Sequence, residues 1–312
     1  MTRRTPRDIS ICIFGSSARM TNDEMSDRDV LIVASDRRSA KDEITRWKAA
    51  GWSVSFYSRA RLWRVAQSGS LFIKHLQLEG KIIADTSYWL TDTLKMYREK
   101  RNYSAEISEA IDLVRPLQRL HRDFSNDGPF LAADIGYVFL RNYAIYRCAQ
   151  EGTFLFDYAA LLEELQCLER FGDRSRNQLM QLRLGKHAHR SDHSALCDVS
   201  DMKFASHWIA DACSHLSIEP IARDTPIRKL ATPYATLRDS EAALATHGLL
   251  NASGDEMPST LRNARRMIKK PKDYSWHVSK ISDEWVAKVN DALCMFSPTT
   301  KSIENYQDPI RL

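Results

Sequence analysis

The chain has 312 residues, 43% hydrophobic and 27% charged, which is the composition of a globular protein of one large or two ordinary domains. No apolar run reaches the length of a membrane span, and no apolar segment follows the first residues as in a signal peptide, so we expect a cytoplasmic protein with no membrane partner. Its six scattered cysteines form no Cys-x-x-Cys pair, which favours free thiols over disulfides or a zinc site.

The first predicted elements are two short strands, at residues 9–14 and 30–34. Both runs are apolar and rich in β-branched residues, which is typical of buried strands. Asp27 and Asp29 stand two apart where the second strand begins, so we expect both side chains on one face. Two carboxylates on one face repel unless a cation lies between them, and hard oxygen ligands favour Mg²⁺ or Mn²⁺.

A polar segment that joins these strands begins with Gly15-Ser16. Glycine lets a backbone approach a ligand closely, and a serine hydroxyl can donate to a phosphate oxygen. Further along, the pattern predicts helices at 59–67 and 70–79 and strands at 52–57 and 81–84, after a first helix at 37–50.

Strand signals nearly disappear after residue 86. The fold class that we predict is therefore α+β, with a small mixed-sheet domain at 1–100, a mainly helical domain at 101–220 and an irregular and helical extension at 221–312. The predicted helices lie at 88–101, 105–124 with a kink at Pro116, 130–150, 157–171, 174–185, 201–216, 239–247 and 282–295.

Gly15-Ser16, Arg19 and Ser26-Asp27-Arg28-Asp29, followed by an apolar strand, resemble the motifs of the polymerase-β-type nucleotidyltransferase superfamily, and most closely those of its minimal nucleotidyltransferase branch. The resemblance implies that Asp27 and Asp29 are catalytic and bind divalent metal. It also implies a nucleotide site formed by Gly15, Ser16, Arg19 and Ser26. The alternative is that the Asp pair only caps and solvates a turn.

In that superfamily the third strand usually carries another carboxylate. Here Ser53 and Ser55 occupy the matching positions, and neither hydroxyl can act as a base or as a strong metal ligand. Glu79 and Asp85 are the substitutes that the sequence offers. Without such a group, turnover would be weak or the site would only bind nucleotide.

Other polar residues suggest accessory roles. Arg141-Asn142 resembles the start of the ribonuclease motif of HEPN helical domains, but Tyr146 stands where the histidine is expected, which predicts an inactive scaffold. Arg141 or Arg147 of this helix could still reach across to the nucleotide. Lys186 and Arg190 form either a phosphate-facing pair at an interdomain cleft or a solvated basic turn. His75 is a lone histidine among apolar residues, which favours packing over substrate contact.

A basic stripe is predicted if residues 260–270 are helical. It would expose Arg262, Arg265, Arg266, Lys269 and Lys270. Such a stripe can follow a nucleic-acid backbone, or it can be an ordinary solvated face, and the net charge of +5 permits an anionic partner without requiring one.

The resemblance implies an Mg²⁺-dependent nucleotidyltransferase that moves a nucleoside monophosphate from a nucleoside triphosphate to an acceptor hydroxyl. The sequence does not identify the acceptor, and a protein Tyr or Ser, a tRNA end, a small molecule such as an aminoglycoside and another nucleotide all stay open. Two alternatives remain. One is a catalytically weakened nucleotide sensor or an antitoxin-type or defence-type regulator, and the other is a nucleic-acid-binding protein that uses residues 262–270.

Overall fold

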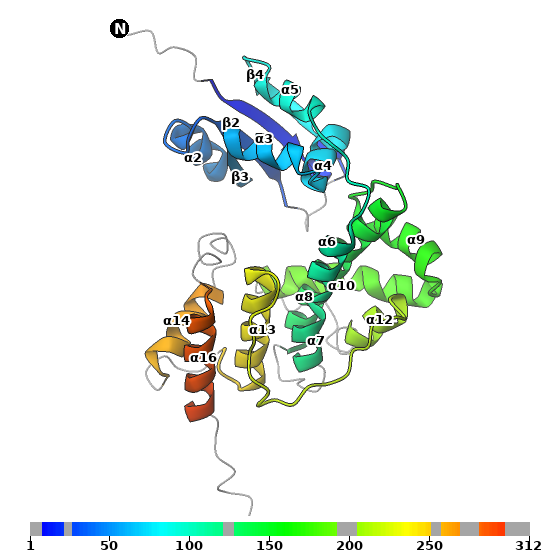
Figure 1. Cartoon of the computed structure of the whole chain (residues 1–312), viewed down its shortest axis with the longest axis vertical. Helices are drawn as coiled ribbons and strands as arrows, with labels where there is room; N and C mark the ends of the chain where they lie inside the picture. The colour runs from blue at the N-terminus through cyan, green and yellow to red at the C-terminus, as the bar shows by residue number, and fades with distance from the viewer. Residues whose placement is uncertain are drawn as a thin grey trace, which may run out of the picture. The chain divides into compact units, whose positions relative to one another are not determined.

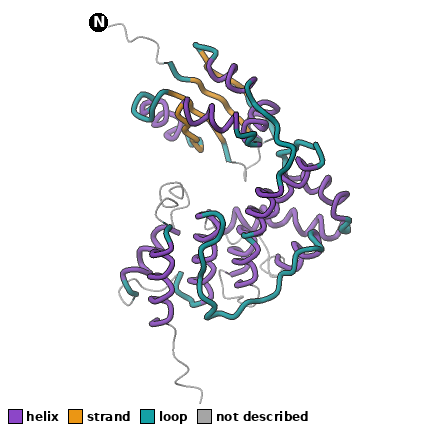
Figure 2. The backbone as a smooth tube through the Cα atoms, viewed as in Figure 1, coloured by secondary structure: helices purple, strands orange, loops and turns teal. Residues whose placement is uncertain are grey.

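The computed structural model describes residues 8–21, 27–120, 128–191, 205–250, 257–268 and 281–296 (Figure 1). The chain divides into two compact units. The first unit comprises Met1–Ser108 and Arg141–Arg176, and the second comprises Glu109–Leu140 and Asn177–Leu312. Figure 2 shows strands grouped in the N-terminal part and helices through the rest of the described chain, which confirms the predicted α+β class.

The first unit contains a four-stranded mixed sheet in the order β3-β2-β1-β4. The central strands β1 (Ser10–Phe14) and β2 (Asp29–Ala34) are antiparallel to each other. Strand β3 (Ser53–Ser58) runs parallel to β2, and β4 (Lys81–Asp85) runs antiparallel to β1. All four strands occur where the sequence predicts them.

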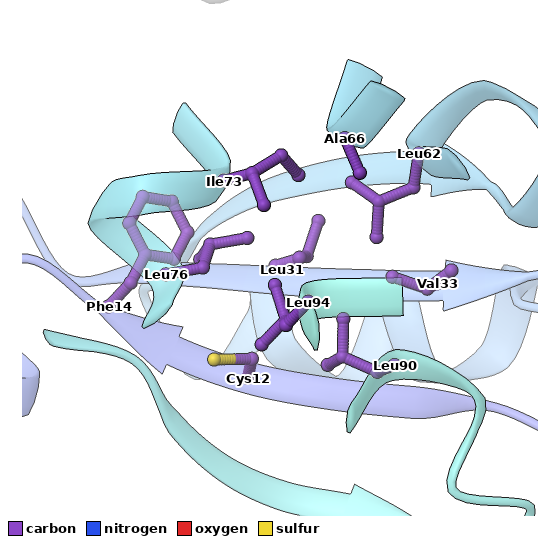
Figure 3. Close-up of a cluster of buried hydrophobic side chains, with 10 residues drawn as sticks. All are labelled: Cys12, Phe14, Leu31, Val33, Leu62, Ala66, Ile73, Leu76, Leu90 and Leu94. Carbon is purple, nitrogen blue, oxygen red and sulfur yellow. The ribbon is translucent and has the colours of Figure 1, made fainter. Parts of the chain in front are cut away.

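Helices cover both faces of this sheet. On one face, α3 (Arg59–Gln67), α4 (Leu71–Glu79) and α5 (Trp89–Lys95) pack against β1 and β2, and on the other face α2 (Lys41–Ala49) packs through Ile44 and Trp47. Figure 3 shows how the side chains of the first core point toward one another; they are Cys12, Phe14, Leu31, Val33, Leu62, Ala66, Ile73, Leu76, Leu90 and Leu94.

Strand β2 separates these two cores by alternation. Leu31 and Val33 contribute to the core under α3, α4 and α5, whereas Val30 and Ile32 contribute to the core under α2. Asp29 continues the row of Leu31 and Val33 by the same alternation. Its side chain therefore belongs to the face covered by α3, α4 and α5, at the end of the sheet where β2 begins.

The other regular elements of the described chain are helices. Serine side chains cap α3 and α4 at Ser58 and Ser70, which explains why the predicted bounds of these two helices agree closely with the structure. The remaining helices are α1 (Ser16–Arg19), α6 (Ser104–Ile111), α7 (Val114–Leu120), α8 (Gly128–Gln150), α9 (Tyr158–Glu169), α10 (Asp173–Ser191), α12 (Ala205–Ala212), α13 (Pro233–Thr246), α14 (Ser259–Ile268) and α16 (Asp283–Phe296).

Several helix predictions need correction; for example, the helix predicted at 88–101 ends at Lys95. The helix predicted at 105–124 is interrupted between α6 and α7, because Pro116 has no N–H to donate to the carbonyl of Asp112 four residues earlier. Helix α13 begins at Pro233, six residues before the predicted start. Thr232 caps it by accepting a hydrogen bond from the Ala235 amide, and proline is favoured in the first helical turn.

Helix α13 is buried from Ala235 to Thr246 although it carries charged residues, and its charges are paired within the second unit. The Asp239 carboxylate accepts hydrogen bonds from Arg119, with Nε–Oδ1 3.0 Å and Nη2–Oδ2 3.2 Å. Arg238 donates from Nη2 to Oδ2 of Asp134 at 2.7 Å. Buried ions are tolerated only when paired in this way, so these contacts hold α13 in one arrangement.

Candidate nucleotide and metal site

Gly15 and Asp29 lie side by side at one end of the sheet. Phe14 at the end of β1 pairs with Asp29 at the start of β2, and a Cβ built on Gly15 would lie 3.7 Å from Oδ2 of Asp29. Gly15 has φ +70° and ψ −151°, a backbone conformation that is nearly restricted to glycine. The fold thus brings the Gly-Ser segment against the carboxylate with which the sequence pairs it.

The segment that carries Asp27 and Asp29 is held in place by contacts of Arg28 on the α2 face of the sheet. Asp27 is exposed and Asp29 is partly buried. The guanidinium carbon of Arg28, which lies between them in sequence, is 4.4 Å from the centroid of the Trp52 ring. The Arg28 carbonyl accepts a hydrogen bond from the Ser53 amide at 2.8 Å. Because Trp52 packs on the core under α2, Arg28 and Asp29 project to opposite faces of the sheet.

The Gly-Ser segment itself turns into a short helix. The Gly15 carbonyl accepts hydrogen bonds from the amides of Ala18 and Arg19, so Ser16 and Arg19 lie at the two ends of α1. Ser26, the other predicted nucleotide ligand, lies outside the described residues. The Ser17 hydroxyl is buried and makes no hydrogen bond to any described residue. Sequence reasoning missed Ser17, although it follows the Gly-Ser pair directly.

Arg19 is bound by two carboxylates of the first unit. Its Nη1 pairs with Glu79 at the end of α4, and its Nη2 lies 3.4 Å from Oδ2 of Asp157. The Nε2 atom of His75 lies 2.8 Å from Oε2 of Glu79. Burial raises the pKa of Glu79, but His75 and Arg19 outweigh it and hold that pKa below its ordinary value. Glu79 is therefore an ion-pair partner for Arg19 and a poor general base.

His75 is packed, as its apolar sequence context predicts. It is 7% exposed, stacks on Phe156 with ring centroids 4.3 Å apart, and meets Phe14 edge-on at 5.7 Å. Its role is to support Glu79 and the core rather than to face solvent.

Strand β3, on which the resemblance predicts a third carboxylate, carries Ser53 and Ser55 on the face of Asp29 instead of an acidic residue. In the parallel register Ser53 pairs with Asp29 and Ser55 pairs with Leu31. Asp85, the other substitute, is at the far end of β1, opposite Ser10. Its carboxylate accepts hydrogen bonds from the Ser10 hydroxyl at 2.7 Å and from the Thr91 amide at 2.8 Å, so it anchors α5.

The donors that are present suit a divalent metal shared with a ligand. Among the described residues, no group of three or more His, Cys, Asp or Glu side chains could hold a metal ion. Two carboxylates, Asp27 and Asp29, fit Mg²⁺, which usually retains waters and takes phosphate oxygens as further ligands. Gly15 lies beside Asp29, and a glycine backbone lets a ligand approach closely.

The predicted accessory residues have other surroundings. Lys186 and Arg190 lie on α10, which continues to Ser191 beyond the predicted end at residue 185. The prediction that these two residues form a basic turn is therefore wrong, because both are helical. Lys186 Nζ is 4.7 Å from the centroid of the Tyr137 ring, and Arg190 Nε donates to Oδ1 of Asp134 at 3.0 Å. These contacts weigh against a phosphate-facing role.

Arg141 is partly buried on α8. Tyr146, which replaces the histidine of the HEPN motif, stacks against Tyr103 with ring centroids 6.4 Å apart, so this position serves packing. The predicted basic stripe is partly described. On α14, Arg262 and Arg266 are exposed and Arg265 is partly exposed, whereas Lys269 and Lys270 lie outside the described residues.

Two further observations concern the cysteines and the lengths of the helices. Cys12, Cys148, Cys167 and Cys294 are free thiols, and Cys197 lies outside the described residues. No helix in the described ranges has the length and apolarity needed to cross a membrane.

Residues 1–125 match the family model described as "Nucleotidyltransferase domain". A comparison with curated proteins found no match. The matched residues contain the whole sheet, Gly15 and both aspartates, which are the features that carry the resemblance.

Proposed function

We propose, on the premise that residues 1–125 form a nucleotidyltransferase domain of the polymerase-β type, that this protein transfers a nucleoside monophosphate from a nucleoside triphosphate to an acceptor hydroxyl. The observation that carries this proposal is the position of Gly15 beside the Asp29 carboxylate, where adjacent strands end and begin. A close backbone approach and a metal-binding carboxylate at one place are what triphosphate binding needs.

Each residue of this site has a role. Asp27 and Asp29 would hold Mg²⁺ or Mn²⁺, and the metal would supply positive charge to the phosphates. In the transfer, the acceptor oxygen bonds to the α-phosphorus, the bond from that phosphorus to the pyrophosphate oxygen breaks, and the hydroxyl proton passes to solvent. Gly15 and Ser16 bind the β- and γ-phosphates, and Ser26 is a further predicted contact. Arg19 adds positive charge beside them. The Ser17 hydroxyl, buried and without a described partner, is a further donor available to this segment.

A nucleotide sensor is the second candidate, and a specific observation favours it. Ser53 is aligned with Asp29, whereas Glu79 and Asp85 are committed to other contacts. The described site therefore contains no general base for the acceptor hydroxyl, which fits an antitoxin-type or defence-type regulator that binds nucleotide with weak turnover. The exposed Arg262 and Arg266 keep nucleic-acid binding as a third candidate.

Labelled nucleotides separate these candidates. The protein is incubated with each α-labelled nucleoside triphosphate and Mg²⁺ or Mn²⁺, with protein, RNA and small-molecule acceptors. An Asp27→Ala, Asp29→Ala variant is the test, and Asp92→Ala is the matched control because Asp92 is exposed and pairs only with Lys95 among its described ionic contacts. Label transfer that only the double variant loses supports the transferase.

Other outcomes support the other candidates. Metal-dependent nucleotide binding without transfer supports the sensor. Salt-sensitive binding of RNA or DNA that survives in the double variant, with no nucleotide binding, supports the third candidate and contradicts the transferase.

A further inference from the structure

The segment between α8 and α9 contacts the residues that surround the Gly-Ser segment. The Phe156 ring stacks on His75, and Lys74 Nζ lies 4.4 Å from the centroid of the Phe154 ring. Next to them, Asp157 reaches Arg19 on α1. All of these residues belong to the first compact unit, although the segment lies beyond the 125 residues that match the family. The helical part of the sequence thus supplies a charged partner to an arginine of the candidate site.

The two ion pairs that Arg19 forms, with Glu79 and with Asp157, differ in strength. The Glu79 side chain is 16% exposed and is also held by His75, whereas the Asp157 side chain is 45% exposed and its contact with Arg19 is 3.4 Å long. The second oxygen of Asp157 is already used, since Oδ1 caps α9 by accepting from the Ala159 amide at 3.0 Å and the Ala160 amide at 3.1 Å. An exposed ion pair of this length is the weaker of the two.

We propose that Asp157 is a built-in competitor for Arg19: nucleotide phosphate displaces Asp157 from the guanidinium while Glu79 keeps it in place. This inference rests on the proposed function, because it requires phosphate at the Gly-Ser segment. A guanidinium has five donors in a rigid fork, so Arg19 can keep Glu79 on Nη1 and offer the remaining donors to phosphate. Its Nε is buried and makes no hydrogen bond to a described residue.

The exchange gives Asp157 a defined effect on affinity. Each bound phosphate must first displace the carboxylate, so Asp157 weakens nucleotide binding by the strength of its ion pair. Removing the charge should therefore tighten binding, in contrast to the loss that follows when a residue that contacts the ligand is removed. The gain in nucleotide affinity should require Arg19, because Asp157 competes with phosphate only for the Arg19 guanidinium.

A double-mutant cycle tests the exchange. Dissociation constants for ATP, GTP, CTP and UTP with Mg²⁺ are measured in the full chain for wild type, Asp157→Asn, Arg19→Gln and the double variant. Asparagine keeps the helix cap, so α9 should be preserved. We expect Asp157→Asn to bind about two- to fivefold more tightly than wild type, the range of an exposed ion pair, and to have no effect when Arg19 is already glutamine.

Controls keep the outcome decisive. Asp92→Asn removes the same charge from the same unit away from Arg19 and should leave affinity unchanged. Asp157→Ser, which also caps helices, replaces Asp157→Asn if that variant misfolds. Equal affinity in Asp157→Asn and wild type, or an equal gain in both Arg19 backgrounds, would overturn the exchange alone. If wild type binds none of the nucleotides, the proposed function fails and the exchange fails with it.

Discussion

Replacing Gly15 by alanine tests the backbone geometry on which the site depends. The added Cβ would lie 3.7 Å from Oδ2 of Asp29, an ordinary van der Waals distance, so a steric clash contributes little. The conformation contributes more, because φ +70° with ψ −151° is a region that non-glycine residues almost never occupy, at a cost of about 1–3 kcal/mol. Backbone strain, and not a steric clash, therefore accounts for most of the expected loss of stability.

Two consequences should follow. The melting temperature of the first unit should fall by roughly 3–10 °C, since each kcal/mol corresponds to a few degrees in a unit of this size. If the strain is relieved by a backbone shift, Gly15 moves relative to Asp29 and Mn²⁺-dependent nucleotide affinity falls as well. Thermal unfolding followed by circular dichroism, and equilibrium binding of Mn²⁺-nucleotide, measure the two effects.

Gly51→Ala is the matched control. Gly51 also has positive φ, at +80°, but a Cβ there would meet nothing within 4 Å. We expect it to lose about 1 kcal/mol of stability with no loss of nucleotide affinity. The reasoning would be refuted if Gly15→Ala were as stable as wild type, or if both variants changed nucleotide affinity equally.

Further predictions concern the carboxylates and the buried ion pairs. Asp29→Asn should weaken Mn²⁺-dependent nucleotide binding at least about tenfold in a titration, whereas Ser53→Asp, which places a carboxylate in register with Asp29, should tighten it; unchanged affinity in either would contradict the assigned metal site. Burial raises the pKa of Asp85, but hydrogen bonds from Ser10 and Thr91 hold it below its ordinary value, so its stabilisation is present above about pH 4 and lost as pH falls through the depressed pKa. Asp85→Asn should therefore destabilise the protein at pH 7, and its difference from wild type in urea unfolding should shrink in acid; a constant difference would contradict this. Arg119→Met should cost about 3–5 kcal/mol in urea unfolding because it removes a partner of the fully buried Asp239, and a cost under about 1 kcal/mol would contradict that pairing.

Local patterns in the sequence determined most elements of the first unit. The apolar runs on either side of the Gly-Ser segment predict β1 and β2, and Ser58 and Ser70 mark the starts of α3 and α4, because strand alternation and helix capping depend on residues a few positions apart. The proximity of Gly15 to Asp29 was predictable for the same reason, since Gly15 follows β1 directly and Asp29 begins β2, the next strand in the chain.

Local sequence patterns did not predict the bounds of helices whose ends and burial depend on contacts with residues distant in the chain. Helix α10 passes through Gly185, and α13 is buried with its charges, because partners such as Asp134 and Arg119 are supplied by other helices of the same unit. A prediction from local sequence contains no information on the burial of a helix or on the distant residues that pair with its charges.

The roles of individual carboxylates were likewise settled by tertiary structure. In sequence, Glu79 and Asp85 are equally plausible third acids. Packing places Glu79 against Arg19, 60 residues away, and Asp85 against Ser10, 75 residues away. Asp157 joins Arg19 across 138 residues. A charge acquires its function from the groups that the fold brings to it, whereas the strand or helix that carries it is determined by its immediate neighbours in the chain.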